Sequence, residues 1–406
     1  MSLSSIVLLF MAMLMAALLL EPLARLLRLP LSAALVAGGF AGSQLMVGSG
    51  LDTGLRWYHF HDLVFYVFLP ALIFESAISL NGRLLLRNLA PIILLALPLL
   101  LLSAGITAAL LYLGIGHPQG FPWITALVCG TLLAATDPVA VTELAKRLPL
   151  PQRLLTLMEG ESLLNDATTV VLFMLLLGST AASSPAASWQ TASLEFGRLA
   201  LGGLAVGLFT GALAGWLIRW LNQAVIISLL TAYAAYLLAE TQFGVSGVMA
   251  SLASGLWLGR LLQKKNDDYA RLIGDWWANL GWIANSSLFL LAGATITLAM
   301  FEARWLAMLI GIGAALSTRV LAVWLVAGLV AVTPRQQAIS NAYRLLMAFG
   351  GLRGAVTLAL ALSLPLELEG WWTAQSIAYG VVLFSLFIQA PLIEPLVKRL
   401  NNRQTL

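Results

Sequence analysis

Four polar side chains stand close together in an otherwise apolar stretch of the chain, at Glu161, Ser162, Asn165 and Asp166. Residues four apart on a helix share a row, so these four side chains form two neighbouring rows on one face. A carboxylate with hydroxyl and amide oxygens beside it can bind a proton or a small hard cation. The alternative is a polar patch that only satisfies neighbouring helices, but two carboxylates are costly in that role within hydrocarbon.

A third carboxylate, Asp137, lies between Thr136 and Pro138 in the middle of another apolar segment. Proline cannot donate a hydrogen bond to the carbonyl of Ala134, and it disfavours helical geometry at the residue before it. We therefore expect the helix to unwind at Asp137 and to expose carbonyl oxygens, which suit a small hard cation. A simple proline kink is the alternative.

A glycine-rich segment, GGLRG at 350–354, follows much later in the chain. Its second glycine, Gly351, lies 214 positions after Asp137. Three glycines weaken a helix, so a second interruption is expected here, although glycines also permit close packing of helices.

Glu75 and Arg319 are among the other charged residues that fall inside apolar segments. Glu75 either adds an oxygen to the cation site or extends its carboxylate to the membrane surface. Arg319 lies in the middle of its segment and therefore needs a buried carboxylate as its partner.

These residues belong to a chain of 406 residues, of which 60% are hydrophobic and 10% are charged, with a mean hydropathy of +0.92. A soluble globule carries far more charge, so the composition indicates an integral membrane protein. The apolar runs exceed the roughly 20 residues of a spanning helix and lack the alternation of barrel strands, which excludes an outer-membrane barrel. With one cysteine, Cys129, and no Cys/His cluster, no zinc, redox centre or other cofactor is expected.

Breaks at proline, glycine and charge clusters predict an all-α polytopic membrane protein with thirteen transmembrane helices and no soluble domain. The predicted helices cover approximately 3–21, 30–47, 61–80, 88–113, 122–148, 153–178, 196–220, 223–240, 244–262, 275–299, 304–332, 336–363 and 370–400. The connection 263–275 is predicted to be a charged loop. Sixteen of the 22 Lys and Arg residues fall in alternate connections, so the positive-inside rule places the N-terminus outside and the C-terminus in the cytoplasm. Because these residues set the topology, nucleic acid is not expected as a partner.

The predicted helices contain a repeat. Three of them begin near 88, 122 and 153, and three others near 304, 336 and 370. Equivalent helices are an odd number apart, so the copies have opposite orientations, as inverted repeats of six helices joined by helix seven. Inverted repeats are typical of alternating-access transporters, and interruptions at equivalent positions in helices five and twelve point to the substrate site.

Three segments together resemble the monovalent cation/proton antiporter family, in its Asn-Asp branch of bacterial and eukaryotic sodium/proton exchangers. They are ATDPVAV at 135–141, ESLLND at 161–166 and GGLRGA at 350–355. Their order and spacing, with the thirteen-helix plan, extend over essentially the whole membrane chain.

The resemblance implies an architecture. Broken helices five and twelve cross, and the protein forms a homodimer. The ion-translocating core comprises helices at about 61–178 and 275–400, and the dimerisation helices lie at about 1–47 and 196–262.

The resemblance also implies roles for single residues. Asp166 is similar to the carboxylate that binds both the transported cation and the proton. The supporting cation ligands are Asp137, the Thr136 carbonyl and Ser162, with Glu75 as a further candidate.

Three more roles follow from the same resemblance. Arg319 resembles the arginine that pairs with Glu161. Asn165 resembles the asparagine that replaces a second acid of electrogenic relatives, and Arg353 resembles a structural or gating residue.

The charges indicate a mechanism. If Asp166 accepts either one proton or one Na⁺, the two ligands compete and each neutralises the carboxylate, so exchange is one-for-one and electroneutral. We therefore expect a secondary active transporter, not an enzyme, that exchanges Na⁺ or Li⁺ for H⁺ across a bacterial inner membrane. Its partners are monovalent cations, protons and the lipid bilayer.

Other functions remain open at this point. K⁺/H⁺ exchange requires the same oxygens as Na⁺/H⁺ exchange. An intramembrane hydrolase with Asp137 and Asp166 as its acid/base pair is less favoured, because Asn165 and the repeat have no role in it. A passive channel is also less favoured, because a lone carboxylate suits stepwise exchange better than multi-ion conduction.

Overall fold

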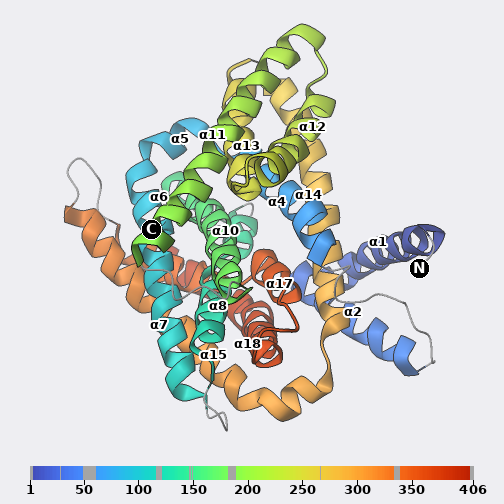
Figure 1. The fold of residues 1–406 in the computed structure, drawn as a ribbon, viewed down its shortest axis with the longest axis vertical. Coiled ribbons are helices and arrows are strands. Elements are labelled where there is room, and N and C mark those ends of the chain that lie inside the picture. The colour runs from blue at the N-terminus through green and yellow to red at the C-terminus, as the bar shows by residue number, and fades with distance from the viewer. Residues whose placement is uncertain are drawn as a thin grey trace. The chain divides into compact units, whose positions relative to one another are not determined.

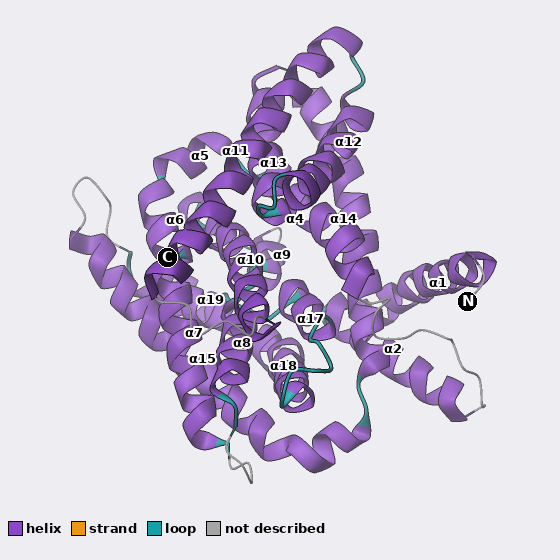
Figure 2. Cartoon of the chain, in the orientation of Figure 1, coloured by secondary structure: helices purple, strands orange, loops and turns teal. Residues whose placement is uncertain are grey.

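The computed structural model describes residues 3–27, 29–48, 61–115, 121–145, 148, 150–181, 189–265, 267–332 and 339–402. Within these ranges Figure 2 shows helices and loops only. The single β-type feature of the described residues is an isolated bridge between Asp137 and Leu352. The predicted all-α class is therefore confirmed.

The helices are numbered in chain order, and most of them carry their labels in Figure 1. The first are α1 (Leu3–Leu27), α2 (Leu31–Gly48), the π-helical turn η1 (Val64–Phe68), α4 (Leu69–Ser79), α5 (Gly82–Arg87), α6 (Leu89–Ala96) and α7 (Pro98–Gly114). The middle ones are α8 (Trp123–Ala134), α9 (Val139–Ala145), α10 (Gln152–Ala181), α11 (Trp189–Leu221), α12 (Ala224–Leu237), the π-helical turn η2 (Leu238–Gln242) and α13 (Gly247–Lys265). The last are α14 (Asp267–Thr295), α15 (Leu298–Val332), α16 (Asn341–Gly350), α17 (Ala355–Leu362), α18 (Trp371–Phe384), the π-helical turn η3 (Ser385–Gln389) and α19 (Ala390–Asn402).

Nine helical stretches among the described residues are long and apolar enough to cross a membrane. They coincide with nine of the predicted spans. α8 is apolar too, but it has only 12 residues. The structure therefore confirms an all-helical chain with many membrane-spanning candidates.

The predicted charged loop at 263–275 is wrong. Instead, α13 continues to Lys265 and α14 begins at Asp267. The segment 263–273 contains no proline or glycine that would interrupt a helix, so its charges alone do not make it a loop.

The chain forms two compact units, each made of separate stretches. Unit 1 comprises Met1–Val64, Pro98–Leu155 and Asn285–Leu406, and unit 2 comprises Phe65–Leu97 and Thr156–Ala284. Both breaks predicted from the sequence, near Asp137 and Gly351, therefore belong to unit 1.

Close helix contacts in unit 1 are made at glycines. The space for a Cβ atom at Gly39 of α2 is filled by the carbonyl of Leu290 of α14, and that at Gly293 of α14 by the carbonyl of Val36 of α2. The contact is reciprocal, so both helices need a residue without a side chain there. Such small residues let backbones approach closely where no hydrophobic effect drives association.

Unit 2 has a longer glycine row on α11. Four glycines spaced four residues apart face α13: Gly203, Gly207, Gly211 and Gly215. The Cβ position at Gly203 is filled by the carbonyl of Ser246, and that at Gly207 by the carbonyl of Ala250. This row lets α11 and α13 pack backbone to backbone.

Candidate ion-binding site

The first predicted interruption is present. α8 ends at Ala134, and Ala135 has φ −58° and ψ 137°, which is not helical. α9 begins at Val139, directly after Pro138. The chain is therefore unwound at Thr136 and Asp137, as the proline predicts.

The second predicted interruption is also present. α16 ends at Gly350, and Gly351 has φ −78° and ψ 82°. α17 begins at Ala355, after Gly354 with φ −127° and ψ −143°.

The two interruptions meet. The backbone N–H of Asp137 donates to the carbonyl of Leu352 at 2.7 Å, and the N–H of Leu352 donates to the carbonyl of Asp137 at 3.1 Å. This pair of hydrogen bonds is the isolated bridge between the two breaks. It satisfies backbone groups that lost their helical partners.

The partly buried Asp137 carboxylate lies at the start of both following half-helices. Its Oδ1 accepts from the N–H of Val139 at 2.9 Å, and the backbone of Ala355 also forms a hydrogen bond with the carboxylate. The carboxylate fills the space of a side chain at Gly354. Because helix N-termini carry a partial positive charge, they stabilise an anion here.

The carbonyls beside the first break are not all exposed, contrary to the sequence expectation. The Arg353 Nη1 donates to the carbonyl of Ala135 at 3.1 Å, and the Thr357 hydroxyl donates to that of Leu132 at 3.1 Å. The Asp137 carbonyl likewise accepts from the N–H of Leu352. Residues at and just after the second break therefore supply hydrogen-bond donors to carbonyls at the first break. Arg353 therefore has a structural contact at the break.

Arg319 has a matching role at the second break. Its Nη2 donates to the carbonyl of Met347 near the end of α16 at 3.1 Å, and Gln389 Nε2 donates to that of Phe349 at 2.7 Å. A cation suits the C-terminus of a helix, which carries a partial negative charge. The absence of a side chain at Gly351 leaves room for the guanidinium, because a Cβ there would lie 2.9 Å from Nη2.

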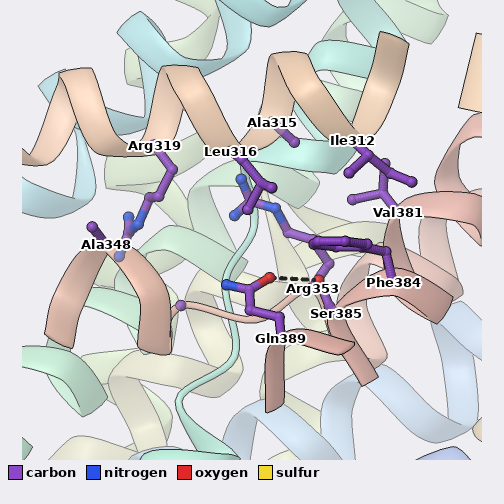
Figure 3. Close-up of a pocket in the computed structure, with 11 residues that line it drawn as sticks. Ile312, Ala315, Leu316, Arg319, Ala348, Arg353, Val381, Phe384, Ser385 and Gln389 are labelled. Atoms are coloured by element: carbon purple, nitrogen blue, oxygen red, sulfur yellow. Dashed lines mark hydrogen bonds between the residues drawn. The ribbon is translucent and has the colours of Figure 1, made fainter. Parts of the chain in front are cut away.

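Both arginines are buried, with 2% of Arg319 and 4% of Arg353 exposed, and both line one small cavity. Figure 3 shows Arg319 reaching from α15 toward Ala348, and Gln389 bonded to Ser385. The cavity volume is about 10 Å³, which is room for one water molecule.

The other predicted residues lie in unit 2. On α10, Asn165 Nδ2 donates to Glu161 Oε1 at 3.4 Å, and Thr169 Oγ1 donates to Asn165 Oδ1 at 3.2 Å. All three side chains are buried. They form the row predicted for Glu161 and Asn165, lengthened by Thr169.

The neighbouring row holds Ser162, which is buried, and Asp166, which is partly buried. Glu75 is partly buried on α4, and its Cγ lies 3.0 Å from the Cβ position of Gly281 on α14. Thus α10 brings together Glu161, Ser162, Asn165 and Asp166, whereas unit 1 brings together Thr136, Asp137, Arg319 and Arg353.

Comparison with known proteins assigns the chain to a family. The family described as sodium/hydrogen exchanger, transmembrane, matches residues 10–399. The chain belongs to this family. Family membership and the candidate spans of the described residues identify it as a multi-pass membrane protein.

Matches to two relatives each extend over most of this sodium/hydrogen exchanger family member. It is 34% identical over 350 residues to the Na⁺/H⁺ antiporter ApNhaP of Aphanothece halophytica, a match that covers 84% of this chain and 65% of that protein. It is 30% identical to the Na⁺/H⁺ antiporter NhaH of Halobacillus aidingensis, a match that covers 84% of each. The chain thus spans about two thirds of the length of ApNhaP.

A solved structure has the same fold. The sodium proton antiporter MjNhaP1 of Methanocaldococcus jannaschii superposes with a TM-score of 0.81 at 21% identity, over 98% of each chain.

Three residues that bond to the two breaks or to Asn165 were missed by the sequence analysis. They are Thr169, Thr357 and Gln389. The spacing of four after Asn165 is a signal for Thr169, because such residues share a helix row. Gln389 is a polar residue in an apolar run, which is also a signal. The role of Thr357 depends on a partner 225 positions away, and no local pattern indicates it.

Within the described residues no three His, Cys, Asp or Glu side chains gather into a group that could hold a metal ion. The cation site expected from the sequence is of another kind, because it combines the carboxylates of Asp166 and Asp137 with a hydroxyl and a carbonyl oxygen.

Proposed function

We propose that this protein is a secondary active transporter that exchanges Na⁺ or Li⁺ for H⁺ by alternating access. Its family and the Na⁺/H⁺ antiporters among its relatives support this function. The proposed ligands of the ion site are the transported ions, and the proposal includes no cofactor.

The observation that carries the proposal is the junction of two broken helices at Asp137 and Leu352. Non-helical backbone at membrane depth is tolerated only where it is buried in protein or lines a water-filled cavity. Pairs of discontinuous helices with charged groups at their ends form the substrate sites of many transporters. This exchanger family member has such a pair, with a carboxylate at the N-termini and two arginines at the preceding C-termini.

In the proposed mechanism Asp166 binds one proton or one cation at a time. Ser162, Thr136 and Asp137 support the cation, with Glu75 as a further candidate. Each cycle then carries one cation in one direction and one proton in the other, which is electroneutral. Because Asp137 contacts two helix N-termini, we assign it a positioning role as well.

An ion pair between Glu161 and Arg319 is the second part of the proposal, and it rests on the family resemblance. Each side chain is buried, with 1% and 2% exposed, and a buried charge needs compensation. A double-mutant cycle with Glu161→Gln and Arg319→Ala tests it by melting temperature. Losses that simply add would contradict the pair.

The proposed architecture has thirteen spans. Beyond the nine candidate spans, the predicted spans are the broken helices α8–α9 and α16–α17 and the more polar helices α13 and α14. These elements support inverted repeats in which broken helices five and twelve cross. We further propose an outside N-terminus, a cytoplasmic C-terminus, and a homodimer formed through helices at about 1–47 and 196–262, with a core at about 61–178 and 275–400.

Transport in proteoliposomes tests the function. Vesicles with an acidic interior and a trapped pH dye are given Na⁺, Li⁺ or K⁺ outside, and the interior should become alkaline with Na⁺ and Li⁺. A response to K⁺ alone would replace the proposal with K⁺/H⁺ exchange. An imposed membrane potential should not drive uphill Na⁺ movement, and accumulation under potential would contradict one-for-one exchange.

A further inference from the structure

Helix α15 is kinked at Arg304, whose φ of −130° and ψ of 15° are not helical. Beside the kink lies a cavity of about 140 Å³. A protein cavity of about 150 Å³ can admit a benzene molecule. The cavity can therefore hold a small molecular group, and it is separate from the arginine cavity of Figure 3.

The cavity lining has a polar and an apolar part. Arg304 of α15 and Thr373 of α18 supply the polar part, and Ile115, Leu306 and Ile310 supply much of the apolar part. The end of α7 approaches α15 closely here, because a Cβ at the neighbouring Gly114 would lie 3.0 Å from Ile310. All of these residues belong to unit 1.

The charge of Arg304 is not compensated within the part of the chain that the structure describes. No described carboxylate forms an ion pair with it, and its Nε is buried without an acceptor. Its Nη1 makes one long contact of 3.5 Å with the carbonyl of Ala303, and its guanidinium carbon lies 5.4 Å from the ring centre of Trp372. The adjacent N-terminus of α18 has no side-chain cap and adds further positive potential.

Aromatic residues place this cavity at a membrane surface. Tyr112 at the end of α7 and Trp123 at the start of α8 pack edge to face at 5.3 Å. Trp305 and Trp372 lie at the kink of α15 and the start of α18. Tryptophan and tyrosine concentrate where hydrocarbon meets water, at the level of lipid headgroups.

The outer flank of the cavity is apolar. Trp305, Leu306 and Leu309 are each more than half exposed on α15. In a membrane such side chains contact acyl chains, so a cation at headgroup level lies directly above an acyl-chain surface.

We propose that this cavity binds the phosphate group of a phospholipid. The Arg304 guanidinium and the Thr373 hydroxyl bind the phosphate oxygens, while an acyl chain follows Leu306 and Leu309. Arginine pairs well with phosphate because its donors match the oxygens in a fork. The apolar flank favours a lipid over free inorganic phosphate.

Native mass spectrometry of the purified full chain in detergent tests this site. The protein is titrated separately with dioleoylphosphatidylglycerol, with dioleoylglycerol, which has the same chains without phosphate, and with sodium phosphate. Arg304→Gln should weaken the tightest phosphatidylglycerol binding by about tenfold, the usual value of one charge-assisted hydrogen bond. Dioleoylglycerol and sodium phosphate should bind no better to the wild type than to this variant.

The matched control is Arg198→Gln. Arg198 is an exposed arginine that pairs with Glu195 at 2.6 Å, so its loss removes the same charge elsewhere and should leave the tightest binding unchanged. If Arg304→Gln aggregates, Arg304→Lys replaces it, and loss of the fork should still weaken binding severalfold. Equal lipid binding by the wild type and the Arg304 variant overturns the proposal, as does equal loss in Arg198→Gln or selective capture of free phosphate.

Discussion

The carboxylate of Asp137 fills the space that a Cβ atom would occupy at Gly354. The same carboxylate accepts a hydrogen bond from Val139 at the start of α9. One side chain therefore lies at the start of two half-helices that are far apart in the sequence. A side chain at Gly354 would displace this carboxylate and disturb both breaks.

Replacing Gly354 with alanine is therefore expected to lower the free energy of unfolding by about 1–3 kcal/mol, the usual cost of overpacking. The melting temperature in detergent measures this. Gly105→Ala in α7 is the matched control, because nothing lies within 4 Å of the added methyl group. The control should keep or slightly raise the melting temperature. Equal melting of the two variants would mean that the carboxylate moves aside freely.

Local chemistry predicts where the breaks lie but not how their carbonyls are satisfied. Pro138 and the glycines at 350–354 interrupt the helices that contain them, so the sequence alone predicts these two breaks. The donor to Ala135 is Arg353, 218 positions away, and only the folded chain brings them together.

The same distinction applies to helix packing. The spacing of Gly203 and Gly207 indicates a packing face on α11 from the sequence alone. Its partner α13 is known only from the structure, because many apolar helices of this chain could fit such a face.

Asp166→Asn is expected to abolish exchange, because an amide neither takes up a proton nor compensates the charge of a cation. Dye response in proteoliposomes should fall to that of protein-free vesicles, while the melting temperature changes little at this partly buried position. Transport at the wild-type rate by this variant would contradict the assigned role of Asp166.

Asn165→Asp is expected to destabilise the protein more at pH 8 than at pH 5. The new carboxylate would lie one helical turn from the buried Glu161 carboxylate, whose Oε1 now accepts from the Asn165 amide. An introduced charge that is buried without a new partner costs several kcal/mol, and protonation of the introduced carboxylate at low pH removes that charge. Melting curves at both pH values measure the difference.

Thr169→Val is the control for that variant. It removes the hydroxyl that donates to Asn165 without adding a charge, so its effect on melting should be the same at both pH values. A pH-independent loss in Asn165→Asp would mean that the carboxylate turns away from Glu161.

Gln389 offers a test of the two arginines at the second break. Gln389→Leu removes the donor to the Phe349 carbonyl and should cost about 1–3 kcal/mol, the penalty of an unsatisfied buried acceptor. Gln389→Glu removes the same donor, but its carboxylate enters the cavity lined by Arg319 and Arg353. A charge-assisted hydrogen bond to a guanidinium should offset much of the loss.

Gln375 provides the matched pair of variants. It is buried and donates to the Ala361 carbonyl at 3.0 Å, but it does not line the arginine cavity. Gln375→Glu should therefore melt well below Gln375→Leu, because it buries a carboxylate beside a carbonyl without a cation. At position 389 the order should reverse, with the glutamate variant melting above the leucine variant. The same order at both positions would mean that the guanidinium groups do not reach the side chain at 389, and that the positive charge at this break is already fully compensated.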